Sequence, residues 1–328
     1  GKPLQLPPLG IGAWAWGDRL FWGYDEKQDA DIKEAFDTCV NSGITLFDTA
    51  EIYGPGRSEE LLGRFLRESG KASDTIVATK FAALPWKTNR SDVVSACKAS
   101  LERLGTDSIG LYQIHFPSPW KNEAFWDGLG DCYEQGLVKG VGVSNYGSEA
   151  LRGVHKSLAD RGIPLTSNQV QYSLVYRYPE LNGVKATCDE LGVKVLAYSP
   201  LGLGALTGKF SEKLPSGPRE GLAKQFVADP GFNDLIGQMK AVAAGKGGSA
   251  TPSQVALAWC MAKGTIPIPG ARNARQARDN VGALSLRLTS REVEDLDAAA
   301  SKVAPVLKPE INPMVRESLD TKIKMFES

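Results

Sequence analysis

The segment ITLFDTAEIYG, residues 44 to 54, changes abruptly from an apolar run to polar and aromatic residues. Leu46 and Phe47 are typical of a buried strand, and Asp48 follows them directly. Tyr53 and Gly54 come five and six residues after the acid, where the chain is expected to turn. The segment therefore predicts a short buried strand whose C-terminal end carries functional side chains.

Seven more short β-rich runs occur along the chain, and amphipathic stretches such as 29–43 (DADIKEAFDTCVNSG) separate them. Eight apolar strands that alternate with helices indicate a parallel sheet covered by helices. We therefore predict an α/β fold, a (β/α)8 TIM barrel forming one domain over residues 1–328, in preference to an open doubly wound sheet. The seven further runs are GIGAW (10–14), TIVATKF (75–81), IGLYQIHF (109–116), GVGVSN (140–145), TSNQVQYS (166–173), VKVLAYSP (193–200) and TIPIPG (265–270).

Two segments do not fit this repeat. Residues 202–231 are rich in Gly, Pro and Lys, which predicts a long loop after the seventh strand. Beyond Thr289, the segment SREVEDLDAAASK predicts one more helix, followed by an irregular tail.

Composition excludes several classes of function. Lys plus Arg and Asp plus Glu both number 38, so no global field favours nucleic acid or an anionic membrane. Five widely spaced cysteines without a CxxC pair indicate buried thiols rather than disulfides or zinc. No apolar run approaches the roughly 18 residues of a membrane span. With only two histidines, and His155 in a predicted helix, a hydrolase or isomerase with a multi-histidine metal site is disfavoured, and we expect no metal.

Ionisable residues at the ends of three successive strands predict a proton-transfer site, since such ends form the active face of a barrel. Asp48 and Tyr53 follow the second strand, Lys80 ends the third and His115 the fourth. A lysine ammonium should lower the phenol pKa, and a carboxylate should hold the lysine charged. The histidine could share in proton transfer or donate a hydrogen bond. Alone, each residue could be a surface or packing residue. Glu51 is interpreted as a solvated carboxylate.

An ordered series of motifs resembles the aldo-keto reductase superfamily over nearly the whole chain. The motifs GAWAWGD and GTIPIPGARNARQARDN are similar to its plant and cyanobacterial branch, which includes chloroplast pyridoxal reductase-like enzymes. The series that carries the resemblance is DTAEIYG (48–54), ATKF (78–81), YQIHFP (112–117), GVSNY (142–146), NQVQYS (168–173) and AYSPLGLGALTGK (197–209).

The resemblance implies an oxidoreductase that reduces an aldehyde or ketone with NADPH. Tyr53 would be the general acid, Lys80 and Asp48 would tune it, and His115 would orient the carbonyl. The cofactor would lie across the barrel mouth without a Rossmann domain, consistent with the absence of a G-x-G-x-x-G turn after the first strand. The further residues that the resemblance assigns to the cofactor are Gly12, Ala13, Trp14, Ser144, Asn145, Gln169, Tyr198, Ser199, Pro200, Leu201, Gly202, Gly204, Lys209, Arg219, Gly270, Arg272, Gln276, Asp279 and Asn280.

Within this set, Ser144, Asn145 and Gln169 would bind the carboxamide, and Tyr198 would stack on the nicotinamide ring. The guanidinium of Arg272 suits a ribose 2′-phosphate, which favours NADPH over NADH. The alternative is that arginines 272, 275 and 278 form a solvated helix face.

The substrate is expected to be a small aldehyde or ketone in an aromatic-walled pocket, with no nucleic acid or membrane partner. The alternative function is an NADPH-binding regulatory protein of the potassium-channel β-subunit type. We expect a monomer in the chloroplast stroma, after loss of a transit peptide, or in the cytoplasm. The aromatic residues near the strand ends are Trp14, Trp16, Trp22, Phe81, Trp86, Phe116, Trp120 and Tyr146.

Overall fold

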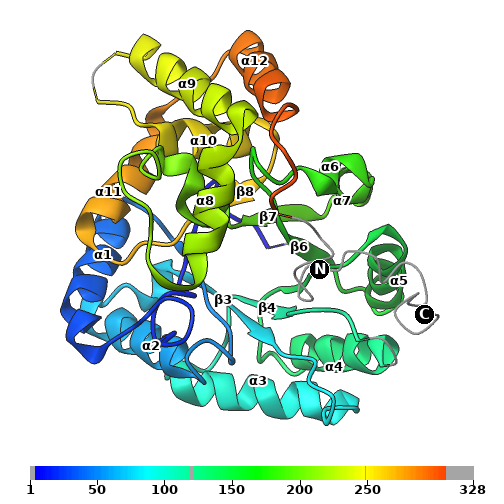
Figure 1. The fold of residues 1–328 in the computed structure, drawn as a ribbon. Helices are drawn as coiled ribbons and strands as arrows, with labels where there is room; N and C mark the ends of the chain where they lie inside the picture. The colour runs from blue at the N-terminus through cyan, green and yellow to red at the C-terminus, as the bar shows by residue number, and fades with distance from the viewer. Residues whose placement is uncertain (1–3, 119–120, 248, 308–328) are drawn as a thin grey trace.

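Eight parallel strands form the centre of the protein and pair in chain order (Figure 1). The computed structural model describes residues 4–118, 121–247 and 249–307. Each of the eight predicted runs coincides with one strand; seven runs contain the whole strand, and β6 begins one residue before its run. The strands are β1 (Ile11–Gly12), β2 (Leu46–Asp48), β3 (Ile76–Phe81), β4 (Leu111–Ile114), β5 (Val141–Ser144), β6 (Leu165–Gln171), β7 (Lys194–Tyr198) and β8 (Ile266–Pro267).

Backbone contacts between the first and last strands bring the sheet round on itself. The Gly10 N–H donates to Pro267 O and the Gly12 N–H to Pro269 O, both at 3.0 Å. Gly12 also forms a parallel bridge with Gly270. A Cβ at position 12 would lie 2.9 Å from the Ile268 carbonyl oxygen, so this close approach needs glycine. The predicted (β/α)8 barrel is confirmed, and the open doubly wound alternative is excluded.

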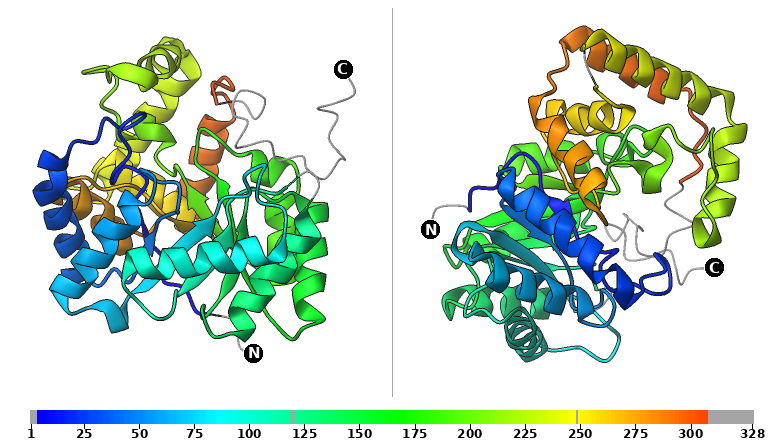
Figure 2. Two further views of the ribbon diagram at one scale, coloured as in Figure 1. Left: turned by 90° about the horizontal axis from the view of Figure 1, so that it is seen from below. Right: turned by 90° about the vertical axis from the view of Figure 1, so that its left-hand side faces the viewer.

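Amphipathic helices surround the strands, as Figures 1 and 2 show. In α1, Ile32, Phe36 and Cys39 recur at helix spacing and are fully buried against the barrel. The surrounding helices are α1 (Asp29–Asn41), α2 (Arg57–Ser69), α3 (Arg90–Leu104), α4 (Asn122–Glu134), α5 (Ser148–Ala159), α6 (Tyr178–Leu181), α7 (Val184–Leu191), α10 (Pro252–Ala262) and α11 (Ala274–Gly282).

The segment after β7 differs from the prediction of a long loop. It contains two short 3-10 helices, η3 (Gly202–Thr207) and η4 (Gly217–Arg219), and then α8 (Glu220–Ala228). Its Gly, Pro and Lys content indicated a loop, but Ala223 and Phe226 lie on one helix face and are fully buried.

Two helices lie beyond the repeat, and the sequence analysis identified only the second. They are α9 (Pro230–Gly245) and α12 (Ser290–Ala300), which pack against each other at the top of Figure 1. The predicted tail from residue 308 onward lies outside the described residues.

The core has three parts: the barrel interior, the layer between barrel and helices, and a cluster beneath α9, α10 and α12. All five cysteines are buried and unbridged, as predicted. Burial raises the pKa of the Cys39 thiol to about 12. Within the described ranges, none of the helices combines the length and apolar character that crossing a membrane requires.

Candidate active site

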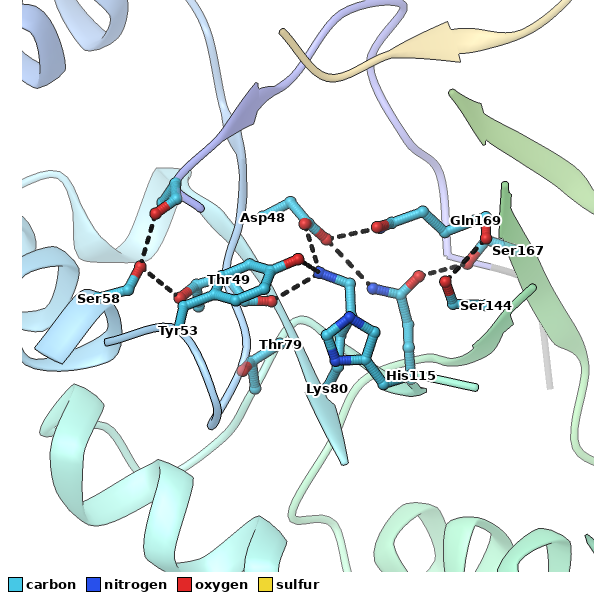
Figure 3. Close-up of polar contacts among 12 residues, drawn as sticks. Asp48, Thr49, Tyr53, Ser58, Thr79, Lys80, His115, Ser144, Ser167 and Gln169 are labelled. Atoms are coloured by element: carbon cyan, nitrogen blue, oxygen red, sulfur yellow. Dashed lines mark hydrogen bonds and ion pairs between the residues drawn. The ribbon is translucent and has the colours of Figure 1, made fainter. Parts of the chain in front are cut away.

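The C-terminal ends of the strands surround a cavity of about 970 Å³. Asp48, Tyr53 and His115 line it, whereas Lys80 is fully buried behind them. The register places Asp48 beside Ala78, so that Lys80, two residues further along β3, projects on the same side beyond the end of β2. The strand order therefore brings Asp48, Lys80 and His115 together, and the turn after β2 adds Tyr53 to them (Figure 3).

Asp48 and Lys80 form a buried ion pair. Lys80 Nζ lies 2.5 Å from Asp48 Oδ1 and donates a second hydrogen bond to the Thr49 carbonyl oxygen at 2.8 Å. Asp48 Oδ2 accepts from Gln169 Nε2 at 2.7 Å and from Gln113 Nε2 at 3.3 Å. Both charged side chains are at most 3% exposed. Each charge therefore has the partners that a buried ion requires.

Tyr53 lies above this pair, and its hydroxyl is 3.4 Å from Lys80 Nζ. The Tyr53 ring is exposed to solvent on the side that faces the cavity, and protein surrounds its other sides. Burial raises the pKa of Tyr53 well above its usual value, and the negative charges of Asp48 and Asp18 raise it further. The net shift of the Tyr53 pKa is upward, and the lowering by Lys80 that the sequence suggested stays a prediction. At neutral pH Tyr53 is a phenol, with a proton to donate.

His115 stands edge-on to Tyr53, with a ring centroid separation of 5.6 Å. Its backbone N–H donates to the Phe81 carbonyl oxygen at 2.9 Å, which fixes the residue at the end of β4. Burial lowers the pKa of His115 well below its usual value, and the Lys80 charge lowers it further. The imidazole is therefore neutral at pH 7 and can offer one N–H as a hydrogen-bond donor.

A second group of predicted residues lies beside this centre. Tyr198 Oη donates to Asn145 Oδ1 at 3.0 Å, and Asn145 Nδ2 donates to the His115 carbonyl oxygen at 3.1 Å. Ser144 Oγ donates to the Gln169 carbonyl oxygen at 2.8 Å. Asn145 has φ 61°, a left-handed conformation that asparagine tolerates better than most residues. These contacts hold amide and hydroxyl groups at one edge of the cavity.

The segment after β7 lines the cavity with its backbone in an unusual conformation. Ser199, Leu203 and Gly204 have φ of 49°, 56° and 102°, and all three face the cavity. Gly202 does not line the cavity but is buried beside Val175. A Cβ at position 202 would lie only 2.7 Å from Val175 Cγ2. Ala13, also predicted to line the cavity, is fully buried in the core. Both positions support the cavity wall from behind.

Cationic side chains line the cavity around Trp22. Arg219 and Arg272 lie over the Trp22 ring, 4.8 Å and 5.6 Å from its centroid. Arg272 Nη1 also donates to the Trp22 carbonyl oxygen at 3.2 Å. Arg272 is thus directed inward, whereas Arg275 and Arg278 are exposed, and of these two only Arg275 is among the described lining residues. The alternative of a solvated helix face holds for Arg278 but not for Arg272.

The remaining predicted cofactor residues also reach the cavity. Gln276 Oε1 accepts from the Arg272 N–H at 2.9 Å, and Asn280 Nδ2 donates to the Gly270 carbonyl oxygen at 3.1 Å. Asp279 accepts from Thr251 Oγ1 at 2.7 Å. The other predicted positions that line the cavity are Gly12, Trp14, Pro200, Leu201 and Lys209.

The predicted aromatic residues divide into four groups. Trp14 and Trp22 line the cavity, and Phe116 packs against the His115 ring at 5.5 Å. Trp86 is 74% exposed. Trp120 lies outside the described residues. The members that belong to the buried core are Trp16, Phe81 and Tyr146.

Several lining residues were not found from the sequence. Some come from irregular segments and from the end of the described chain, where no periodic pattern marks them. Phe21 is one, stacked on Trp14 at a centroid separation of 5.0 Å. Leu203, Thr207, Ser253 and Arg275 lie in helical segments, and the sequence does not show that these positions face the cavity. The main further members are Leu203, Thr207, Phe210, Lys213, Leu214, Ser253, Arg275, Val306 and Leu307.

Glu51 corrects one interpretation. It was expected to be solvated, but its side chain is only 13% exposed. Its Oε1 accepts from the Ala82 N–H at 2.6 Å and from Lys87 Nζ at 2.7 Å. The pattern of strands and polar strand ends in the sequence could not predict this contact. It depends on how the loop after β3, which carries Ala82 and Lys87, folds back onto Glu51.

Within the described ranges, no three His, Cys, Asp or Glu side chains lie together in a way that could hold a metal ion.

Residues 8–301 match the model of the aldo/keto reductase family. The chain belongs to the aldo/keto reductase family. It is 46% identical to the chloroplastic pyridoxal reductase of Arabidopsis thaliana over 92% of this chain and 85% of that protein. This match confirms the resemblance to the plant branch and supports an oxidoreductase activity.

Two solved structures have the same fold. The glycerol dehydrogenase of Gluconobacter oxydans is 25% identical, with a TM-score of 0.78 over 92% of this chain and 93% of its own. An aldo-keto reductase from Klebsiella pneumoniae in complex with NADPH is 26% identical, with a TM-score of 0.71 over 89% of this chain and 90% of its own.

Proposed function

We propose that this protein is an NADPH-dependent reductase that converts an aldehyde or ketone to the alcohol. The observation that carries the proposal is Tyr53, a neutral phenol in the cavity wall whose hydroxyl is 3.4 Å from the buried Lys80 ammonium. A proton donor backed by a fixed positive charge is suited to a carbonyl oxygen that gains negative charge.

Proton donation leaves Tyr53 as a phenolate. The high pKa of Tyr53 in the resting state reflects burial, so the phenolate needs local stabilisation when it forms. Lys80 supplies it, because Asp48 holds the ammonium in place at 2.5 Å. His115, neutral and adjacent to the Tyr53 ring, offers an N–H that would orient the carbonyl oxygen.

The cavity fits an extended dinucleotide. Its lining combines the amide and hydroxyl groups of Ser144, Asn145 and Gln169, a glycine-containing turn and the arginines around Trp22. Bound there, the nicotinamide would supply the hydride. Tyr198 would pack on the nicotinamide ring.

The other predicted positions continue the cofactor site toward the adenosine end. The turn at 199–204, with Lys209 and Arg219, would hold the pyrophosphate, and Arg272 the ribose 2′-phosphate. The NADPH complex of the Klebsiella pneumoniae reductase supports this choice of cofactor. Gly270, Gln276, Asp279 and Asn280 would hold the adenosine.

The substrate end is aromatic, with Trp14 and Phe21 stacked beside Tyr53. An aromatic aldehyde suits such walls. Pyridoxal is the first compound to test, since the Arabidopsis relative is a pyridoxal reductase by name. Its chloroplastic location supports the chloroplast stroma for this protein, and we propose that it acts as a monomer.

The test compares the wild type with Tyr53→Phe over a panel of aldehydes, with NADPH and with NADH. The variant keeps the ring and loses the hydroxyl, so we expect a fall in kcat of about a thousandfold with nearly unchanged NADPH affinity. Substantial turnover by the variant would refute the general-acid role. Tight NADPH binding by a wild type that turns over no carbonyl would favour the regulatory alternative instead.

A further inference from the structure

The position of Tyr53 is not set by a strand. Strand β2 ends at Asp48, and Tyr53 follows five residues later in an irregular turn. Inside the turn, the Tyr53 N–H donates to the Ala50 carbonyl oxygen at 3.0 Å. This local bond shapes the turn. Lys80 Nζ holds the start of the turn through the Thr49 carbonyl oxygen at 2.8 Å, but Thr49 lies four residues before Tyr53. A further contact between the turn and β3, nearer to Tyr53, is needed to keep the hydroxyl near the ammonium.

Glu51 contacts β3 and the residue after it through both its backbone and its side chain. Its backbone N–H points to the Lys80 carbonyl oxygen at 3.4 Å, which extends the β2–β3 pairing by a weak contact. Its carboxylate accepts the Ala82 N–H at 2.6 Å. Glu51 therefore contacts the backbone of Lys80 and of Ala82, the residues on either side of Phe81.

Lys87 completes this arrangement from the loop after β3. Its ammonium lies 2.7 Å from Glu51 Oε1 and 4.7 Å from the centroid of the Phe81 ring. Both side chains of the ion pair are less than one-fifth exposed, so solvent screens the pair only in part. Charge-assisted hydrogen bonds of this kind are short and directional, which suits them to hold a loop in register.

We propose that Glu51, with Lys87 as its counterion, is a positioning residue that holds Tyr53 at the distance from Lys80 needed for proton donation. The inference rests on the proposed function, since it gives Tyr53 the role of acid. Glu51 itself touches neither substrate nor cofactor. Its effect arises because a reacting group displaced by about 1 Å can lose roughly a hundredfold in rate.

Three variants separate the parts of the contact. Glu51→Gln keeps an oxygen for the Ala82 N–H and removes the charge, Glu51→Ala removes both, and Lys87→Met keeps an apolar stem and removes the ammonium. We expect kcat to fall about tenfold in Glu51→Gln and Lys87→Met, and about a hundredfold in Glu51→Ala. NADPH affinity should stay within about twofold of the wild type, because the contact lies outside the cofactor region.

The decisive measurement is the single-turnover rate of carbonyl reduction, with deuterated and with ordinary NADPH. The effect of Glu51→Gln on this rate is compared in the wild-type and the Tyr53→Phe backgrounds. If Glu51 acts through Tyr53, Glu51→Gln lowers the rate in the wild type and has no further effect on the residual rate of Tyr53→Phe. An equal fall in both backgrounds overturns the proposal. Full activity of Tyr53→Phe would instead refute the proposed function, so the two failures are distinguishable.

The matched control is Glu190→Gln, which removes the charge of an exposed ion pair with Arg152 between α5 and α7. It should leave kcat, KM and the melting temperature unchanged. If Glu51→Ala fails to fold, the single-turnover comparison of Glu51→Gln decides the question, since that variant keeps the hydrogen bond to the Ala82 backbone. Wild-type kcat in both Glu51→Gln and Lys87→Met would also overturn the proposal.

Discussion

Replacing Asp48 by asparagine would leave Lys80 as a buried charge without its counterion. The ammonium is fully buried and lies 2.5 Å from the carboxylate that the substitution removes. Breaking a buried ion pair in this way costs about 3 to 5 kcal/mol. Asparagine keeps an amide oxygen near Lys80, and the Thr49 carbonyl oxygen stays in place, so we expect the lower end, about 3 kcal/mol at pH 7.

This cost should depend on pH in a defined direction. Burial already lowers the pKa of Lys80 below its usual 10.5, while the Asp48 charge opposes that shift. Removing Asp48 therefore lowers the Lys80 pKa further. The stability difference between wild type and variant is complete below the variant's Lys80 pKa. It then shrinks by about 1.4 kcal/mol per pH unit and vanishes as pH rises through the wild-type Lys80 pKa.

Urea unfolding followed by tryptophan fluorescence, from about pH 7 to about pH 10, measures this difference. The double variant Asp48→Asn with Lys80→Met is the control, because it removes the orphaned charge and should be more stable than Asp48→Asn alone. A stability loss that does not change with pH, together with a double variant no more stable than the single one, would refute the assignment of a buried charged pair.

Two further results follow from the geometry of the cavity. Arg272→Ala should weaken NADPH binding about thirtyfold and NADH binding less than about threefold, measured by quenching of protein fluorescence, and an equal loss for both cofactors would contradict the 2′-phosphate role. Because burial and the Lys80 charge lower the pKa of His115 well below its usual value, kcat/KM should show no histidine ionisation between about pH 6 and 8, and a histidine-like inflection in that range would contradict a neutral imidazole.

The architecture was predictable because it depends on local patterns. Each of the eight apolar runs coincides with a strand, and helix periodicity identified the helices that cover them except the short α6. The segment after β7 was less predictable. Its glycines and prolines indicated a loop, whereas α8 forms because Ala223 and Phe226 bury one helix face against the rest of the chain. That burial is a tertiary effect, and the sequence of the segment does not report it.

The candidate site divides in the same way. Asp48, Lys80 and His115 were predicted because each ends a strand, and parallel strands place their C-terminal ends on one face. Cavity residues such as Phe21 and Val306 come from irregular segments without a periodic signal. Placing them requires the path of those segments in space.

The sequence alone determined the barrel, the family and the chemical groups at the strand ends, since these follow from periodicity and from ordered motifs. Only the tertiary structure decided the charge states and the support of those groups. Burial and the charges of Asp48 and Asp18 raise the pKa of Tyr53, and these neighbours surround it only in the folded chain. Glu51 changed from a solvated acid to the link between the Tyr53 turn and β3, because Ala82 and Lys87 reach it only in the folded chain. Desolvation and long-range contacts depend on neighbours in space, and neighbours along the chain do not specify them.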